Sequence, residues 1–300
     1  MVEYLISFFS FVTIFALFSL GLNLQWGMAG LVNFGHVGFM AVGAYAAVLL
    51  SQAGLPLALA VVIGVMLAGA IAVGVGLLTL RLREDYLAIV TIGVAEILRL
   101  VATNEEWLTG GTRGIQDYPL PLVSLLPRSS YGWGLLLLML LCLGVVLAAL
   151  IWLERSPWGR VLKAIREDEE VAVALGKNVL LYKLQAFSLG AMVAAIAGIF
   201  FVWRLTTVYP DYFVPLLTFR AWTIVAIGGA GSNFGVLLGA LVYQIYVDAP
   251  RFLPNAFQQT LGGGRLEAIQ VILIGLTLVL IMAWRPQGLL GKSAELTLSK

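Results

Sequence analysis

The sequence contains several continuous apolar runs of about 20 residues, which is the length that a helix needs to cross the hydrocarbon core of a bilayer. The runs do not alternate between apolar and polar residues, so they predict transmembrane helices and not the strands of a barrel. Only 11% of the 300 residues are charged and 61% are hydrophobic, whereas a soluble domain carries about 25% charged residues. The apolar excess must face lipid, and the mean hydropathy of +0.98 agrees. We therefore expect an all-α polytopic membrane protein.

Eight apolar segments can be counted, and they predict one transmembrane domain over residues 1–300 with no linker to a second domain. Glu3, without any Lys or Arg, precedes the first segment, which predicts a retained span and not a cleaved signal peptide. The eight segments are residues 4–25, 28–50, 56–80, 86–103, 132–153, 183–203, 221–247 and 266–284.

The charges between the segments predict the orientation, because short cytoplasmic loops are rich in Lys and Arg. The loop of residues 154–182 is the most basic, so we expect it in the cytoplasm. The same rule places residues 81–85 and the C-terminus, with Arg285 and Lys292, on that side, and the turn-rich stretch 104–131 on the other. The basic side chains in and beside the large loop are Arg155, Arg160, Lys163, Arg166, Lys177 and Lys183.

The seventh segment, residues 221–247, does not fit a single crossing. Segment 183–203 runs outward, and segment 266–284 must return inward. The stretch between them therefore has to enter and leave the membrane on the same face, as a re-entrant pair of helices does.

A glycine-rich break inside this segment, from Gly228 to Asn233, supports the re-entrant prediction. We expect one half-helix over residues 221–227, a break at membrane depth, and a return helix over residues 234–247. Irregular backbone at that depth is tolerated only where it is buried in protein or lines a cavity. Ser232 or Asn233 is placed to cap the return helix.

The sequence excludes the commonest catalytic and energy-coupling sites. It has no G-x-x-x-x-G-K-[ST] phosphate loop and no H-E-x-x-H zinc motif, and it contains one histidine, His36. Its one cysteine, Cys142, cannot form an internal disulfide or a metal cluster. We expect no metal and no cofactor on this chain, and any ATP that is used must be hydrolysed by another chain.

The loop from Ser156 to Gly176 predicts two short amphipathic helices. Ser156 before Pro157 is a typical helix start, and Lys163 and Glu167 are spaced to pair on the resulting helix. Asp168 then begins the acidic N-terminus of a second short helix, and Gly176 is placed to end that helix. The alternative is a solvated charged loop that only sets the orientation.

Several motifs, in this loop and elsewhere in the chain, resemble those of one family. Ser156-Pro157-Trp158-Gly159-Arg160, followed by Lys163-Ala164-Ile165-Arg166-Glu167-Asp168-Glu169, resembles the cytoplasmic loop of branched-chain amino-acid ABC transporter permeases of the LivM type. Glu170-Val171-Ala172, with Gly176 four residues beyond, is similar to the E-A-A-x-x-x-G pattern of ABC permeases, with Val171 in place of alanine. Further similar motifs are Gly21-Leu22-Asn23-Leu24, Gly35-His36-Val37-Gly38-Phe39, Leu108-Thr109-Gly110-Gly111-Thr112, Gly228-Gly229-Ala230-Gly231-Ser232 and Pro286-Gln287-Gly288-Leu289.

The resemblance implies a type II-like importer permease in a bacterial inner membrane. Its implied partners are a second, related permease, two cytoplasmic ATPase subunits that carry ATP-Mg, and an extracytoplasmic substrate-binding protein. The ATPase-coupling residues that it implies are Ser156, Gly159, Arg160, Ala164, Ile165, Arg166, Glu167, Asp168, Glu169, Glu170, Ala172 and Gly176.

Polar residues and glycines inside the apolar segments are candidates for the translocation pathway, since polar groups there seldom face lipid. For His36 the favoured interpretation is a neutral imidazole hydrogen-bonded between helices, and for Glu96 an intrahelical pair with Arg99. The glycines are equally explained by close helix packing. The candidates are Asn23, Asn33, His36, Glu96, Gly228, Gly229, Gly231 and Ser232.

Three classes of function compete on these grounds. An importer permease agrees with the motifs, and a related permease for urea or short amides is its variant. A stand-alone secondary transporter or channel would need a coupling carboxylate deep in the membrane, for which Glu96 is the one candidate. A membrane enzyme lacks a cluster of catalytic groups.

Overall fold

The computed structural model describes residues 2–80, 82, 84–249, 272, 275–277, 279–280, 283–284 and 287–291, and this part of the chain is almost wholly helical. Its one β-bridge joins Ile115 to Val208. The elements are α1 (Val2–Leu22), the π-helix η1 (Asn23–Met28), α2 (His36–Gln52), α3 (Leu57–Thr79), α4 (Glu84–Asn104), α5 (Glu106–Thr109), η2 (Gly111–Arg113), α6 (Arg128–Arg155), α7 (Pro157–Glu167), α8 (Glu169–Ala174), α9 (Val179–Leu205), η3 (Pro210–Phe213), α10 (Leu216–Gly228) and α11 (Asn233–Asp248).

Five helices are long and apolar enough to cross a membrane, and each matches a predicted segment. They are Val2–Met28, which continues α1 through η1, Leu57–Thr79, Asp85–Asn104, Arg128–Arg155 and Val179–Leu205. The expected all-α polytopic fold is therefore confirmed. The predicted segment 266–284 falls largely outside the described residues.

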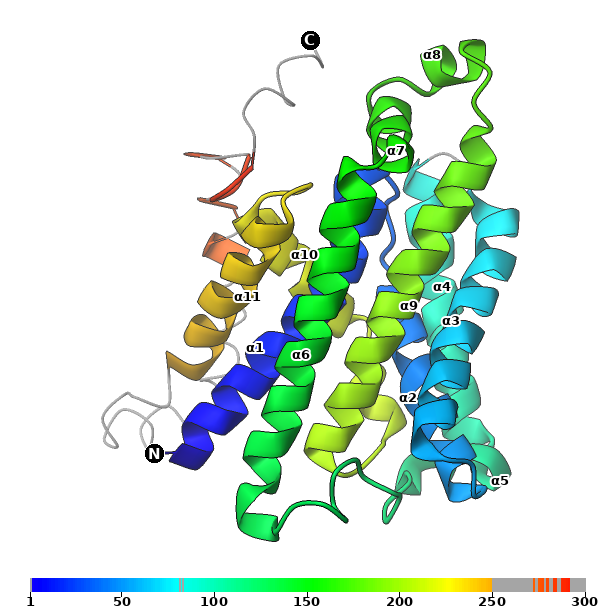
Figure 1. Cartoon of the computed structure of the whole chain (residues 1–300). Helices are drawn as coiled ribbons and strands as arrows, with labels where there is room; N and C mark the ends of the chain where they lie inside the picture. The colour runs from blue at the N-terminus through cyan, green and yellow to red at the C-terminus, as the bar shows by residue number, and fades with distance from the viewer. Residues whose placement is uncertain are drawn as a thin grey trace.

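Helices α1, α2 and α9 form the most buried part of the bundle, and α2 lies behind α9 in Figure 1. In the most apolar stretch, 78% of α9 is buried against 22% of α4 and 28% of α6. Glycine allows the helices to approach closely, since a Cβ on Gly198 would lie 2.1 Å from the carbonyl oxygen of Met40 on α2. Small residues have this role in membrane bundles because they allow backbones to pack directly.

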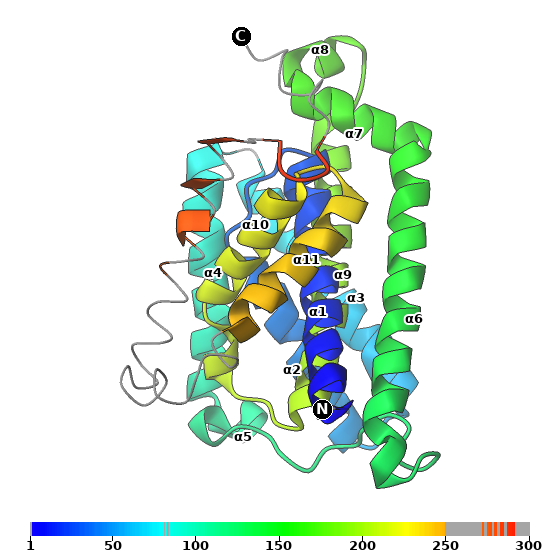
Figure 2. The ribbon, with the colours of Figure 1, turned by 90° about the vertical axis from the view of Figure 1, so that its left-hand side faces the viewer.

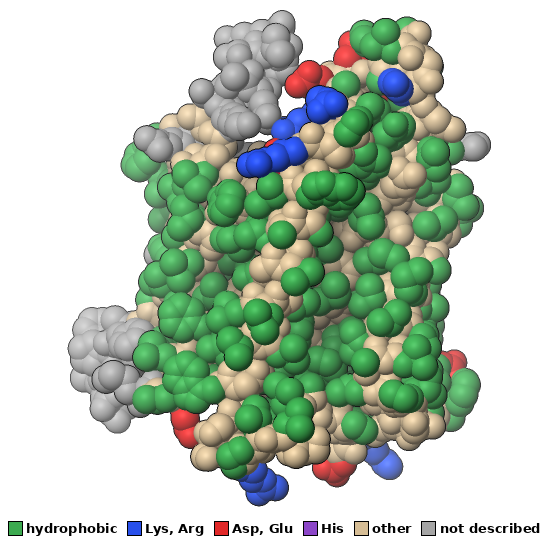
Figure 3. Space-filling view, viewed as in Figure 1, with side chains coloured by type: hydrophobic (Ala, Val, Ile, Leu, Met, Phe, Trp, Pro, Cys, Tyr) green, Lys and Arg blue, Asp and Glu red, His purple; other side chains and the backbone are tan. Residues whose placement is uncertain are grey.

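The two ends of the bundle differ in what they carry. The helices α7 and α8 project from one end, here called the α7 end, whereas α5 and the loop to α6 lie at the opposite α5 end (Figures 1 and 2). On the face shown in Figure 3, the charged side chains gather at these two ends and an apolar band separates them. This distribution agrees with a bilayer around the middle of the bundle.

The second predicted segment, residues 28–50, is wrong at its start. The chain leaves the π-helix η1, runs without regular structure over residues 29–35, and becomes helical only at His36. Gly30 has a φ of +71°, which a glycine adopts without strain. As a result α2 has 17 residues, fewer than the about 20 that a helix typically needs to cross a bilayer.

The re-entrant pair is present, and its helices begin and end within five residues of the predicted bounds. α10 and α11 are bent by 117° at a break of a few residues, so the second helix turns back. Ser232 caps α11 by accepting a hydrogen bond from the Gly235 amide. Near the end of α11, Asp248 lies 3.4 Å from the hydroxyl of Tyr4, in the first turn of α1.

The break of this pair was predicted at membrane depth, and it lies nearer to one end of the bundle. It lies at the α7 end, where Asn233 contacts Glu154 in the last turn of α6. The reason is that α10 begins at Leu216, five residues before the predicted start, and so extends further through the bundle. The C-terminal segment closes over the break, because the amides of Leu289 and Leu290 donate to the carbonyls of Ile227 and Gly228.

Candidate coupling and translocation site

The first helix of the basic loop, α7, starts directly from the end of α6. Ser156 caps it as predicted, with its hydroxyl accepting from the Gly159 amide and donating to the Leu153 carbonyl 2.7 Å away. A Cβ on Gly159 would lie 2.4 Å from the carbonyl oxygen of Glu154. Glycine is therefore required for the sharp change of direction between the two helices.

The second helix, α8, is held against α7 by a small apolar cluster. Asp168 caps it by accepting from the Val171 amide. Ile165, Ala172 and Val179 are buried together, so two helices and the start of α9 form one unit. Gly176 ends the helix with a φ of +75°, as predicted. This compact arrangement differs from the alternative of an extended solvated loop.

The predicted coupling residues divide into two sets. Gly159, Ile165 and Ala172 are buried and hold the helical pair together, and Ser156 is half-buried. The others are exposed to solvent: Arg160, Ala164, Arg166, Glu167, Asp168, Glu169, Glu170 and Gly176.

Three exposed apolar residues on and just after α8 were not among the coupling residues predicted from the sequence. Val171 is 53% exposed, Val173 57% and Leu175 71%. Exposed apolar side chains that cluster outside a membrane band mark contact surfaces. They could not be recognised as a surface, because a helix of only six residues has no recognisable apolar period.

The ion pairs of this loop connect it to the spans. Lys163 binds Glu154 on α6, with Nζ 2.9 Å from Oε1, instead of the predicted Glu167. Lys183 on α9 binds Glu169 at 2.6 Å. Both pairs tie the short helices to a long neighbour, which restricts their movement relative to it.

The irregular segment 29–35 has its backbone groups satisfied by side chains, as buried irregular backbone requires. The Phe34 amide donates to Thr91, and the Asn33 carbonyl accepts from the indole of Trp222 at 3.1 Å. The Asn33 side chain donates to Gln25 and accepts from the Gly35 amide. The predicted pathway residue Asn33 thus holds the irregular segment that precedes α2.

His36 is fully buried at the start of α2. Its Nε2 lies 3.1 Å from the carbonyl oxygen of Phe18, in the middle of α1. The favoured interpretation from the sequence, an imidazole bonded between helices, agrees with this geometry.

Asn23 joins the π-helix to the break of the re-entrant pair. Its Oδ1 accepts from the Gly231 amide at 2.8 Å and its Nδ2 donates to Asn233 at 3.1 Å. Gly27 lies against the same break, since a Cβ there would be 2.4 Å from the Gly231 nitrogen. A π-helix is rare and occurs mostly at functional sites. Residues 23 and 231 were both predicted, whereas their contact was not.

The remaining glycines of the break are packing positions in this structure. A Cβ on Gly228 would lie 2.2 Å from the Gly235 carbonyl oxygen. One on Gly229 would lie 2.5 Å from the Gly291 nitrogen.

Glu96 lies apart from this group. It binds Arg99 on the same helix at 2.5 Å, as the sequence predicts, and Arg99 also lies 3.3 Å from Asp211 in η3. Asp211 is 87% exposed. The pair therefore belongs to the α5 end, away from Asn23 and the break.

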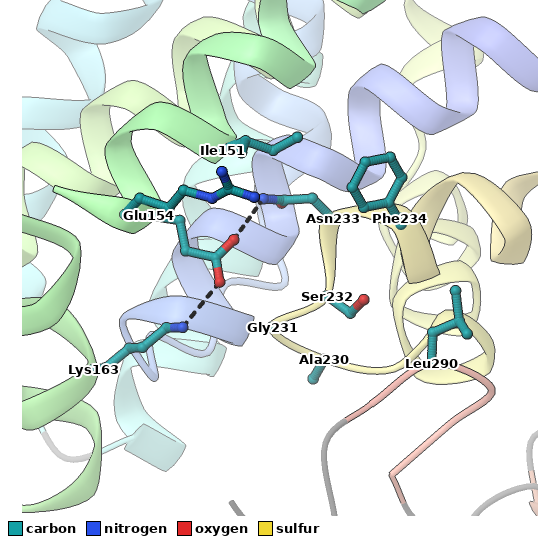
Figure 4. A pocket seen from close by; sticks show the side chains of 10 residues that line it. Ile151, Glu154, Lys163, Ala230, Gly231, Ser232, Asn233, Phe234 and Leu290 are labelled. Carbon is teal, nitrogen blue, oxygen red and sulfur yellow. Dashed lines mark hydrogen bonds and ion pairs between the residues drawn. The ribbon is translucent and has the colours of Figure 1, made fainter.

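A cavity of about 380 Å³ borders the break at the α7 end. Figure 4 shows the Glu154 carboxylate between Lys163 and Asn233 at its wall. Within the described ranges no group of three or more His, Cys, Asp or Glu is placed to hold a metal ion. The lining residues are Ile151, Glu154, Arg155, Lys163, Ala230, Gly231, Ser232, Asn233, Phe234 and Leu290.

A bundle of spans with an irregular segment before α2 and a sharply bent helix pair has the interrupted helices that are typical of transporters. The comparison with protein families agrees. Residues 4–282 match the family described as the permease component of the branched-chain amino acid transport system. The chain belongs to this family of ABC transporter permeases, so it is a transport subunit and not an enzyme.

Individual relatives support the same assignment. The chain is 35% identical to the high-affinity branched-chain amino acid transport system permease protein LivM of Escherichia coli, over 92% of this chain and 68% of the relative. It is 27% identical to the probable LivM of Methanocaldococcus jannaschii, over 93% and 91%. It is 25% identical to the permease protein LivH of E. coli, over 93% and 91%. No solved structure matches.

The comparisons confirm the resemblance seen in the motifs and decide among the three classes of function. The chain is the permease component of a branched-chain amino acid ABC transport system. Similarity to both LivM and LivH implies that it pairs with a related permease. In this family ATP is bound by separate ATPase subunits.

Proposed function

We propose that the α7–α8 loop is the docking site for one of two ATPase subunits, which carry ATP-Mg in the cytoplasm and together drive the import of branched-chain amino acids. The observation that carries this proposal is the exposed apolar surface of Val171, Val173 and Leu175. These side chains lie on a rigid helical pair beyond the apolar band, where water would otherwise cover them. Burial of these side chains in a groove of the partner stabilises the complex through the hydrophobic effect.

With the docking loop on the cytoplasmic side of a plasma membrane, the α7 end and the C-terminus both lie on that side. The α5 end then faces an extracytoplasmic substrate-binding protein. Exposed side chains there, such as Trp107 at 80% and Leu125 at 76%, offer a surface for it. A second, related permease completes the membrane part as a heterodimer.

We propose that the pathway is bordered by the two interruptions of regular helix. One carries Asn23, Asn33 and His36, and the other is the break from Gly228 to Ser232. Discontinuous helices are where transporters bind substrates, because their ends offer backbone groups that continuous helices use internally. Glu96, near the α5 end, would border the entrance.

The test replaces Leu175 by arginine in the complete complex and measures how much ATPase subunit copurifies with the permease. Leu175→Arg puts a charge in the proposed apolar contact, so the ATPase should be lost while the permease remains in the membrane. Leu125→Arg is the matched control, with similar exposure at the opposite end, and should retain the ATPase. Full retention in Leu175→Arg would overturn the docking proposal.

A further inference from the structure

A continuous chain of hydrogen bonds runs from α7 to the break of the re-entrant pair. Lys163 on α7 binds Glu154 on α6 at 2.9 Å. The other oxygen of Glu154 accepts from Asn233 at the start of α11, at 3.1 Å. Asn233 accepts from Asn23 of the π-helix at 3.1 Å, and Asn23 accepts from the Gly231 amide at 2.8 Å. We call these five residues the polar link.

The donors and acceptors of the polar link are matched throughout. Asn233 and Asn23 each use both ends of the side-chain amide, and Glu154 uses both oxygens. Asn23 is fully buried and Asn233 is 4% exposed. A buried polar group left without its partner costs the full desolvation penalty. The linked groups therefore resist separation and tend to move together.

We infer that the polar link transmits movement of α7 to the break of the re-entrant pair, with Asn233 and Glu154 as its positioning residues. The inference rests on the proposed docking of ATPase subunits on α7–α8. When the ATPase displaces α7, Lys163 and Glu154 carry the displacement to Asn233. Asn233 begins α11, so the break at Gly231 and the π-helix at Asn23 shift with it.

Two further features favour movement at this place. The cavity beside the break, about 380 Å³, leaves the break unpacked on one side. In addition, the guanidinium of Arg166 on α7 donates to the Gly27 carbonyl of the π-helix. The π-helix is thus attached to α7 directly as well as through the polar link.

The test exchanges the amide and the carboxylate at the centre of the polar link. Asn233→Asp removes the donor that faces Glu154 and brings two carboxylates together. Combining Glu154→Gln with Asn233→Asp restores the pattern, because the new amide at position 154 donates to the new carboxylate at position 233 and still accepts from Lys163. The pair also keeps one negative charge. Asn178→Asp is the control, because Asn178 caps α9 on the exposed side of the same loop and an aspartate caps equally well.

The measurement is uptake of labelled leucine per ATP hydrolysed, in proteoliposomes with the binding protein, normalised to assembled complex. We expect Asn233→Asp to lower this ratio on the order of tenfold, as loss of a charged hydrogen bond implies. The double variant should recover most of it, and Asn178→Asp should equal the wild type. A merely structural role would reduce the amount of complex and leave the ratio unchanged.

Three results would overturn the inference: a wild-type ratio in Asn233→Asp, no recovery in the double variant, or an equal loss in Asn178→Asp. Failure of the docking proposal is distinguishable from these, because Leu175→Arg would then retain its full amount of ATPase subunit. In that case both proposals would be wrong.

Discussion

The main-chain carbonyl of Gly27 accepts a hydrogen bond from the guanidinium of Arg166, 139 residues further along the chain. The contact is close enough that a Cβ on Gly30 would lie 3.3 Å from Cγ of Arg166. It joins the end of the first span to the loop between α6 and α9, and it fills the acceptor of a π-helical carbonyl.

Replacing Arg166 by methionine removes this donor while keeping most of the apolar stem. A hydrogen bond to a charged group contributes about 1.5–3 kcal/mol, so the free energy of unfolding should fall by roughly that amount. Thermal unfolding of the purified permease in detergent would measure it. Arg160→Met is the control, because Arg160 is exposed and its bond to the Arg155 carbonyl faces solvent; it should change stability by less than about 0.5 kcal/mol. Equal effects would contradict the role of the Gly27 contact.

Gly198 and Gly144 predict opposite effects of the same substitution. A Cβ on Gly198 would clash with the Met40 carbonyl at 2.1 Å, whereas Gly144 has nothing within 4 Å. Gly198→Ala should force α9 from α2 and destabilise by about 1–3 kcal/mol or more. Gly144→Ala, within α6, should be neutral or stabilise by up to about 1 kcal/mol. Unfolding temperatures in matched detergent would decide, and a stable Gly198→Ala would contradict the packing of α2 on α9.

The re-entrant pair predicts which engineered cysteines share a side of the membrane. On a Cys142→Ala background, Ala249→Cys after α11 and Leu125→Cys at the α5 end should react with an impermeant thiol reagent from outside. Leu175→Cys should react only from the cytoplasm. Reaction of Ala249→Cys from the cytoplasm alone would mean that α10 and α11 together cross the membrane.

Tyr118, in the loop at the α5 end, predicts a dependence on alkaline pH. Its hydroxyl donates to the Val202 carbonyl at 2.6 Å, and burial raises the pKa of the phenol above its ordinary value. A raised folded pKa adds stability below the unfolded pKa, about 10, and this is lost as pH rises towards the folded pKa. Tyr118→Phe should cost about 1 kcal/mol at pH 8. The difference from wild type should shrink above pH of about 10; a constant difference would contradict it.

Much of the fold follows from the sequence because lipid imposes simple rules. Long apolar runs give spans, and the basic residues from Arg155 to Lys183 mark one end. Ser156 before Pro157 predicts where α7 begins, since capping is a local interaction. The re-entrant pair is predictable because the loop charges alone assign each loop to a side of the membrane, and no tertiary contact is needed to count the crossings.

What was missed depends on contacts between distant residues. The stretch from Asn23 to Gly35 is as apolar as a span, and several of its backbone groups pair with side chains far along the chain, those of Thr91, Arg166 and Trp222. No local pattern contains that information. Glu154 likewise appears as the first polar residue after a span, and its role emerges only when Asn233, 79 residues later, is placed beside it.

The irregular segment 29–35 has a consequence for how the protein is made. Thr218 accepts from the Val37 amide across 181 residues, and Trp222 donates to Asn33 across 189. At a synthesis rate of about 5–20 residues per second, roughly 10–40 s pass before these partners leave the ribosome. During that interval the second helix has polar backbone groups that only water, the insertion machinery or a chaperone can satisfy. Asn33 and Val37 therefore complete these hydrogen bonds only after α10 has been synthesised.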